Sequence, residues 1–231
     1  MTVVGHDVHT NTITSPEQSD DGHFSIMEDV QHGPPSYKIV LLGDSSVGKT
    51  SLVHRFINNR FDNDIPNTIG AAFITKDYTS NDRPVKFEIW DTAGQERYRS
   101  LTPMYYRNAR LALICFDMSN LLSLDRAKYW IDQLELVKEN HDIAIILVGN
   151  KSDLVTESVD LSLVDDFVRE RKFSFYKTSA KLGDGIDQLF NDIANEIDDK
   201  FFDDYYESKQ SDQRGNSLRL NSLATLSNSC C

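Results

Sequence analysis

The residues best suited to chemistry lie in the stretch GDSSVGKT at positions 43–50, which can hold phosphate. It follows the apolar run 37–42 and opens a helix-patterned run at 49–58, so it joins a predicted strand to a predicted helix. Two glycines let the backbone turn so that successive amides point at phosphate oxygens, while Lys49 can reach the terminal phosphates and the Thr50 hydroxyl can ligate magnesium. The predicted phosphate-binding residues here are Gly43, Asp44, Ser45, Ser46, Val47, Gly48, Lys49, Thr50 and Ser51.

A second motif, DTAGQE at 91–96, directly follows another apolar strand pattern. Asp91 is placed to orient magnesium-bound water, Gly94 lets an amide approach a terminal phosphate, and Gln95 can align an attacking water as the catalytic residue. Thr68 lies in the long polar loop 59–72, where it is an ordinary threonine unless it faces the phosphates. If Thr68 faces the phosphates, it would join Thr50 and Asp91 as a third magnesium ligand and also contact the terminal phosphate.

Two later motifs predict that the base is guanine. NKSD at 150–153 and TSAK at 178–181 each sit just past an apolar strand, on the same rim as the phosphate loop. Asp153 can accept from the ring NH and exocyclic amine of guanine, and the Ala180 amide can donate to its carbonyl oxygen. Adenine would leave these groups without matching partners, and such a mismatch can favour guanine over adenine by ~10⁴ or more. Asn150 would join the two loops and the Lys151 stem would cover the base, with Ser179 and Lys181 completing the set.

Strands that alternate with helices predict the fold. Strands are expected at 37–42, 73–80, 84–90, 111–116, 143–148 and 173–176, with helices at 49–58, 124–139 (capped by Ser123), between 148 and 173, and at 186–197. The second and third strands flank the turn signal Asn81-Asp82 and form an antiparallel hairpin. These elements predict an α/β fold, a mostly parallel six-stranded sheet with helices on both faces and ligands at the carboxyl ends of the strands.

Two aromatic residues keep alternative roles at this point. Phe61 in the long loop is either a hydrophobic plug on the domain or a ring packed on the base. Period-2 alternation over 85–90 predicts that Val85, Phe87 and Ile89 are buried and that Trp90 lies on the polar face. That indole is either an edge tryptophan covered by a neighbouring loop or a recognition residue.

Composition excludes several classes of protein. A formal net charge of -12 over 231 residues argues against nucleic-acid binding and against a polybasic membrane anchor. Three cysteines build no disulfide framework, Cys115 is expected as a buried small hydrophobe, and the redox setting is expected to be cytosolic. No apolar run approaches the ~20 residues of a membrane-spanning helix. Residues 1–36, acidic and without Lys or Arg, are expected to form a disordered arm whose four histidines lack ligand spacing.

With GDSSVGKT, WDTAGQE, NKSD and TSAK in this order, residues 37 to about 200 resemble the Ras-like small GTPases, whose G domain has the P-loop NTPase fold. IGAAF at 69–73, KFEIWD at 86–91, ERYRSL at 96–101 and MYYRNA at 104–109 resemble the Rab branch, and are most similar to its early-endosomal, Rab five type. The resemblance implies slow GTP hydrolysis with Mg²⁺ and cycling between GDP- and GTP-bound states. It also implies that Phe61 stacks on guanine and that Phe73, Trp90 and Tyr105 form a patch read by effectors, which favours the recognition role for Trp90.

Ser45 stands where Ras has a glycine whose loss impairs hydrolysis, but Rab proteins commonly carry serine there, so hydrolysis is expected to be retained. The resemblance implies five kinds of partner: a guanine nucleotide exchange factor, a GTPase-activating protein, a GDP dissociation inhibitor, an escort protein with geranylgeranyltransferase, and tethering effectors. Cys230 and Cys231 match the tandem cysteines that carry two geranylgeranyl groups, enough for a stable anchor.

The expected organisation is an acidic arm at 1–36, a GTPase domain at 37–202 and a flexible hypervariable tail at 203–231. The expected role is control of vesicle docking and fusion in early endosomal traffic, from the cytoplasmic face of the early endosome with an extracted cytosolic pool. Two alternatives stay open from the sequence: a GTP-binding scaffold that does not hydrolyse GTP, and a Rab GTPase of another membrane compartment.

Overall fold

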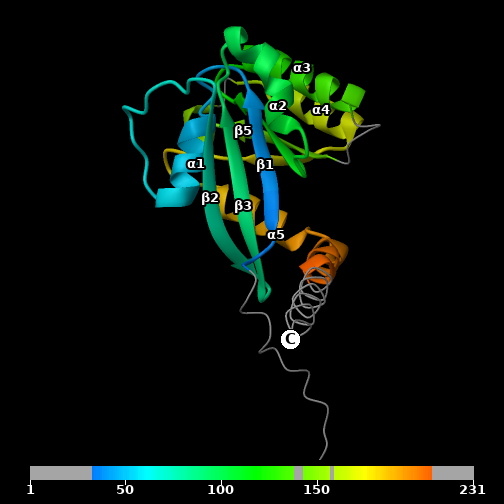
Figure 1. The fold of residues 1–231 in the computed structure, drawn as a ribbon. Helices are drawn as coiled ribbons and strands as arrows, with labels where there is room; N and C mark the ends of the chain where they lie inside the picture. The colour runs from blue at the N-terminus through cyan, green and yellow to red at the C-terminus, as the bar shows by residue number, and fades with distance from the viewer. Residues whose placement is uncertain (1–32, 138–142, 157–158, 210–231) are drawn as a thin grey trace, which may run out of the picture. The chain divides into compact units, whose positions relative to one another are not determined.

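A computed structural model describes residues 33–137, 143–156 and 159–209 (Figure 1). Its six strands form one sheet in the order β2-β3-β1-β4-β5-β6. They are β1 (Ser36–Gly43), β2 (Ala71–Ser80), β3 (Arg83–Thr92), β4 (Leu111–Asp117), β5 (Ala144–Asn150) and β6 (Ser174–Lys177). Only the β2–β3 pair of these strands is antiparallel, so the predicted mostly parallel six-stranded sheet is confirmed.

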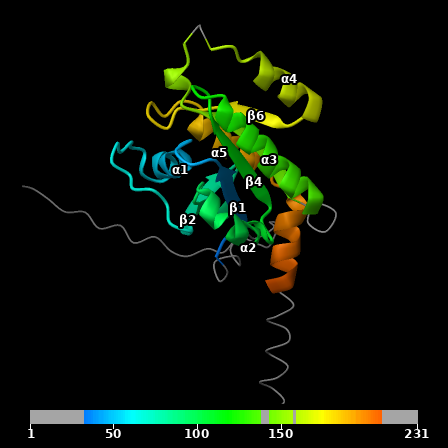
Figure 2. The same cartoon turned by 90° about the horizontal axis from the view of Figure 1, so that it is seen from above.

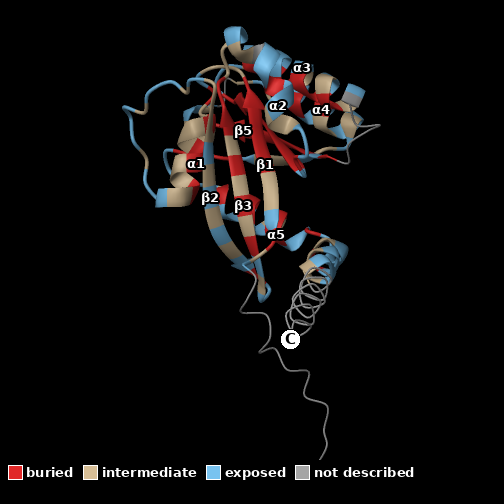
Figure 3. Cartoon of the chain, in the orientation of Figure 1, coloured by how far each residue is buried: buried red, intermediate tan, exposed pale blue. Residues whose placement is uncertain are grey.

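Helices cover both faces of the sheet because the central strands bury side chains on both sides. In β1, Ile39 and Leu41 pack with α1 (Lys49–Asn58) and α5 (Ile186–Asn195), while Val40 and Leu42 pack with α3 (Leu122–Val137) and α4 (Ser162–Arg171). Every residue of β4 is buried, as a strand covered on both faces requires. The neighbouring β1 is buried from Ile39 to Gly43 (Figure 3). Seen from above, α1 and α3 lie on opposite sides of β1 and β4 (Figure 2).

The hairpin of β2 and β3 forms at the predicted turn. Asn81 and Asp82 have φ angles of 49° and 59°, the left-handed pair that a two-residue hairpin needs and that Asn and Asp tolerate. In β3, the predicted alternation is confirmed, since Val85, Phe87 and Ile89 are buried and Trp90 is half-buried on the other face. The register places Phe73 opposite Trp90.

Ser123 does not cap the predicted helix at 124–139. That helix, α3, begins at Leu122, so Ser123 lies in its first turn. The Ser123 hydroxyl accepts a hydrogen bond from the Asp117 amide at 2.8 Å and donates to the Asn120 carbonyl at 2.7 Å. It therefore joins the end of β4 to the start of α3.

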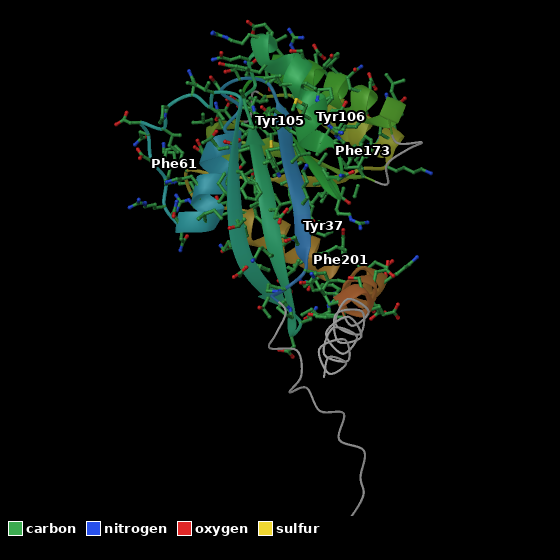
Figure 4. The ribbon with its side chains drawn as sticks, in the orientation of Figure 1. Tyr37, Phe61, Tyr105, Tyr106, Phe173 and Phe201 are labelled. Atoms are coloured by element: carbon green, nitrogen blue, oxygen red, sulfur yellow. The ribbon has the colours of Figure 1, made fainter. Side chains whose placement is uncertain are left out.

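The last predicted helix ends earlier than expected, and another follows it. Helix α5 ends at Asn195 instead of 197, and residues 199–209 form a second helix that includes the first part of the predicted tail. Arg83 explains the break, because its guanidinium donates to the carbonyls of Asn195 and Ile197 and pairs with Asp199. Phe202 is buried and Phe201 meets Tyr37 edge-on, as Figure 4 shows for the latter pair, so this helix packs on the end of the sheet.

None of the helices in the described ranges is long and apolar enough to cross a membrane.

Candidate functional site

A cavity of about 400 Å³ lies at the carboxyl ends of the parallel strands, where the sequence motifs meet. Most of the predicted site residues line it: Ser45, Ser46, Gly48, Lys49, Thr50, Ser51, Phe61, Thr68, Gly94, Gln95, Asn150, Lys151, Asp153, Ala180 and Lys181. The lining does not include Gly43, Asp44, Val47, Asp91 and Ser179. The four motifs therefore converge on one cavity, and these five residues lie outside its lining.

The phosphate loop has a backbone that only glycine fits at its two ends. Gly43 has a φ of +144°, and a Cβ there would lie 2.1 Å from the carbonyl oxygen of Cys115. Gly48 has a φ of +94°, and a Cβ there would lie 2.3 Å from the Asn150 side-chain nitrogen. Both positions therefore require glycine for conformation and for space.

Lys49 follows this loop in the first turn of α1 and is buried. Its ammonium donates to the carbonyls of Gly43 and Asp44 at 3.0 and 2.7 Å, so it is held over the loop. Burial lowers the pKa of Lys49, and the carboxylates of Asp91 and Asp44 partly oppose that shift. A phosphate in the cavity would favour the charged form of this lysine.

Oxygen atoms of Thr50, Thr68 and Asp91 form a cluster beside the loop. The Thr50 hydroxyl lies 2.7 Å from the Thr68 hydroxyl and 2.6 Å from Asp91 Oδ2, which also accepts from Thr68 at 3.3 Å. The other carboxylate oxygen, Asp91 Oδ1, is buried and has no hydrogen-bond partner in the described part of the chain. Burial raises the pKa of Asp91, while the bonded hydroxyls and Lys49 oppose the rise. An all-oxygen set with one unpaired carboxylate oxygen fits a hard divalent cation such as Mg²⁺.

Gly94 and Gln95 place the end of the DTAGQE motif against the phosphate loop. A Cβ on Gly94 would lie 2.4 Å from the Asp44 carbonyl carbon and the Ser45 nitrogen, so the two backbones touch. Gln95 lines the cavity and precedes the 3₁₀ helix η2 (Glu96–Leu101). Its side chain thus lies on the phosphate side of the cavity.

Asn150 ties three segments together at the other end of the cavity. Its side-chain nitrogen donates to the Val47 carbonyl at 2.9 Å, and its oxygen accepts from the Ala180 amide at 3.2 Å and the Thr178 hydroxyl at 3.3 Å. Because Asn150 is 1 % exposed, these bonds form out of contact with water. The phosphate loop and the TSAK segment are therefore held by one side chain.

The carboxylate and lysine of the NKSD motif each have a fixed partner. Asp153 accepts from the Ser179 hydroxyl at 2.6 Å, which leaves its second oxygen for a ligand. Lys151, with a φ of +61°, pairs with Asp117 at 2.8 Å. Burial opposes ionisation of Asp117, but hydrogen bonds from Lys151 and Ser119 outweigh it and lower the pKa of this carboxyl.

Sequence reasoning missed Asp117. Its position in the sequence could have identified it as a site residue. Asp117 is the last residue of the apolar strand β4, which lies between β1 and β5, so it reaches the same edge of the sheet as the motifs. Its part is to hold Lys151 in place.

Phe61 packs on the domain and also borders the cavity, so neither of its two predicted roles is ruled out by its position. It lies in the loop between α1 and β2, packs against the core on the α1 face, and lines the cavity (Figure 4). One ring can therefore pack on the domain and still face a base.

The three predicted effector residues are in contact with one another. The ring centroids of Phe73 and Trp90 are 5.1 Å apart, and those of Trp90 and Tyr105 are 5.8 Å apart. Phe73 is 52 % exposed. The Tyr105 hydroxyl lies 3.6 Å from where a Cβ of Gly70 would be, so this aromatic patch lies close to the loop that carries Thr68.

Cysteines and histidines contribute little to the described structure. Cys115 is fully buried as predicted, and burial raises the pKa of its thiol to about 12. Cys230 and Cys231, the four histidines of the acidic arm and residues 210–231 of the predicted tail lie outside the described residues. Within the described ranges, no group of three His, Cys, Asp or Glu residues could hold a metal. The threonine-rich cluster around Asp91 is therefore the cation candidate to consider.

Comparison with known proteins gives the family. The Ras family model matches residues 38–199. GTP-binding protein YPT52 of Saccharomyces cerevisiae is 40% identical in an alignment of 208 residues that covers 78% of this chain and 88% of the relative. GTP-binding protein ypt5 of Schizosaccharomyces pombe is 46% identical over 163 residues (69% and 77%), and the Ras-related protein RABF2b of Arabidopsis thaliana is 45% identical over 161 residues (69% and 80%). The chain therefore belongs to the Ras family of small GTPases, within its Rab branch.

Proposed function

We propose that this GTPase uses the cavity as a guanine-nucleotide switch that controls docking and fusion of vesicles in early endosomal traffic. The observation that carries the proposal is the convergence of all four motifs on one cavity of about 400 Å³, a size suited to a nucleotide. As a member of its family the chain binds GTP and GDP and hydrolyses GTP, so the scaffold alternative is not retained.

Guanine would lie between Phe61 and Lys151, with its edge toward Asp153 and Ala180. The Asp153 carboxylate has one oxygen engaged by Ser179, and its other oxygen can accept from the base. The Ala180 amide now donates to Asn150 at 3.2 Å, a long bond that a base carbonyl can share or replace. These contacts support specificity for guanine over adenine.

The triphosphate would lie along the phosphate loop and Lys49. Magnesium, when bound, would neutralise developing charge on the β- and γ-phosphates, and Thr50, Thr68 and Asp91 are the residues that would hold it. Oδ1 of Asp91 supports this assignment, because a buried carboxylate oxygen without a partner is costly unless something binds it.

Gln95 would orient the attacking water in line with the bond that breaks. Hydrolysis would join that water to the γ-phosphorus and release GDP as the leaving group. Because Gly94 touches the phosphate loop, its amide is near the expected position of the γ-phosphate. Loss of the γ-phosphate on hydrolysis would remove its contact with Gly94 and so allow Gln95 and η2 to move.

The switch would be read at the aromatic patch of Phe73, Trp90 and Tyr105. Thr68 is two residues before Gly70, which lies close to the Tyr105 hydroxyl, so ordering of Thr68 by the third phosphate would reach the patch through a short, continuous segment. Effectors that tether membranes would bind there. An exchange factor, a GTPase-activating protein, a GDP dissociation inhibitor and an escort protein with its transferase would govern the cycle. Membrane contact would come from prenyl groups on Cys230 and Cys231.

A tagged full chain in cells tests the proposal. The Gln95→Leu variant should stay loaded with GTP, coincide with early endosomal markers and enlarge that compartment. Adding Trp90→Ala should abolish the enlargement without changing the bound nucleotide, because only the patch is altered. Replacing Cys230 and Cys231 by Ser should leave the chain in the cytosol. Accumulation of Gln95→Leu on another membrane would contradict the endosomal role and favour a Rab of another compartment.

A further inference from the structure

Arg55 in the last turn of α1 makes contacts that no sequence motif accounts for. Arg55 is half-buried, and its guanidinium donates to three backbone carbonyls, those of Ala180 (from Nε, 2.8 Å), Lys181 (from Nη2) and Asn59 (from Nη1, 3.1 Å). In the described ranges no carboxylate forms an ion pair with it. Its interactions therefore serve backbone placement, not charge pairing.

The three carbonyls belong to two walls of the cavity. Ala180 and Lys181 line its base end, while Asn59 ends α1 with a φ of 51° and starts the loop that carries Phe61 two residues later. Arg55 thus connects two segments. One carries Ala180 and is expected to contact the edge of the base, and the other carries Phe61 and is expected to stack on the face of the base. The Cδ of Arg55 also lies 3.9 Å from where a Cβ of Gly183 would be, so its stem follows the same loop.

Besides its bonds to Arg55, the loop after β6 has hydrogen bonds within itself and to the NKSD segment. Ser179 accepts from the Gly183 amide at 2.7 Å through its carbonyl and from the Leu182 amide at 3.0 Å through its hydroxyl. Asn150 holds the amide side of Ala180 at 3.2 Å, and Arg55 holds its carbonyl side at 2.8 Å. The orientation of the peptide units around Ala180 is therefore set from opposite sides by Asn150 and Arg55.

We infer that Arg55 is a positioning residue for guanine recognition: it fixes the Ala180 amide toward the carbonyl at position 6 of the base and sets its separation from Phe61. The inference rests on the proposed assignment of the base end of the cavity. Arginine suits the task because its planar fork satisfies several carbonyls at once, which the single ammonium of lysine cannot do. The position-2 amine is recognised by Asp153, whose partner Ser179 is not bonded to Arg55.

Two nucleotide analogues distinguish recognition of the position-2 amine from recognition of the position-6 carbonyl. Inosine diphosphate lacks the position-2 amine but keeps the carbonyl, whereas 6-thioguanosine diphosphate keeps the amine and ring NH but replaces the carbonyl oxygen by sulfur, a weaker acceptor. Dissociation of GDP and both analogues is measured for the full chain, for Arg55→Met, which keeps the bulk of the stem, and for Arg55→Lys. Lys76→Met is the matched control, because Lys76 donates to the Phe56 carbonyl and covers its ring near the same end of α1 without lining the cavity.

For Arg55→Met, GDP release should accelerate about 10- to 100-fold, the effect of losing a charge-assisted hydrogen bond or two. Its preference for GDP over the thio analogue should fall, and its preference for GDP over inosine diphosphate should stay. Arg55→Lys should be intermediate, and Lys76→Met should keep both preferences.

Either of two results would overturn the inference: an unchanged GDP release rate in Arg55→Met, or faster release with the thio preference intact, which would mean general loosening. A wild-type chain that does not distinguish GDP from inosine diphosphate would instead overturn the base assignment, and the inference with it.

Discussion

Replacing Asn150 with Ala should be among the most damaging single changes at the site, because one side chain joins three segments of the chain. The change leaves the Val47 carbonyl and the Ala180 amide without their partners, at bond lengths of 2.9 and 3.2 Å in the intact protein, and removes a weaker bond to Thr178. Each buried polar group left unpaired costs about 1–3 kcal/mol, so the two together should lower the free energy of unfolding by about 2–6 kcal/mol. GDP release should accelerate as well, since the phosphate loop and the base loop lose their common tie.

Urea unfolding at two fixed concentrations of free GDP measures the first effect and separates it from the stabilisation that bound ligand adds. Displacement of a fluorescent GDP analogue measures the second. Asn58→Ala is the control, because that residue is exposed at the end of α1 and its loss should change the unfolding free energy by less than about 0.5 kcal/mol. An effect of Asn150→Ala as small as that of the control would refute the reasoning.

Three further predictions concern single charged residues. Asp153→Asn should weaken GDP binding and improve binding of xanthosine diphosphate, measured by competition, because a carboxamide cannot accept from both guanine donors; adenine nucleotide in purified wild type would contradict this. Asp117 has a lowered pKa, so the stability that it contributes is complete above the ordinary aspartate pKa of about 3.9 and is lost as the pH falls through the lower folded value. In urea unfolding from pH 7 to 3, the deficit of Asp117→Asn should therefore shrink only at the acid end, and a constant deficit would argue against it. Arg83→Ala should lower the free energy of unfolding by about 1–3 kcal/mol through its lost bonds to the end of α5, with GDP release unchanged; altered release would show that this end of the sheet is coupled to the site.

The fold could be predicted from short sequence patterns because each pattern reflects the backbone angles or the burial of the residues within it. Gly43 and Gly48 are required by backbone angles and by atoms within about 2 Å of a hypothetical Cβ, so a loop motif can reveal them. The all-apolar run of β4 and the alternation of β3 reflect two-sided and one-sided burial, which periodicity reports directly.

Arg55 and Asp117 could not be singled out in the same way. Arg55 meets Lys181, which is 126 residues away in sequence, and an arginine on an amphipathic helix gives no sign of which carbonyls it will reach. The helix at 199–209 was hidden for a related reason. Residues 203–209 were predicted as part of the flexible tail, and Phe202 joins the core because Arg83 ends α5 and turns the chain back onto the sheet.

The central claim, that this cavity hydrolyses GTP with Gln95 orienting the water, is tested most directly by single-turnover hydrolysis of bound GTP without an activating protein. The wild-type chain and Gln95→Leu are compared at equal occupancy, with nucleotide dissociation measured in parallel. Gln95→Leu should slow hydrolysis and leave nucleotide dissociation nearly unchanged, because the side chain acts mainly in the transition state. Equal hydrolysis rates in the two proteins would contradict the claim and reduce Gln95 to a loop residue.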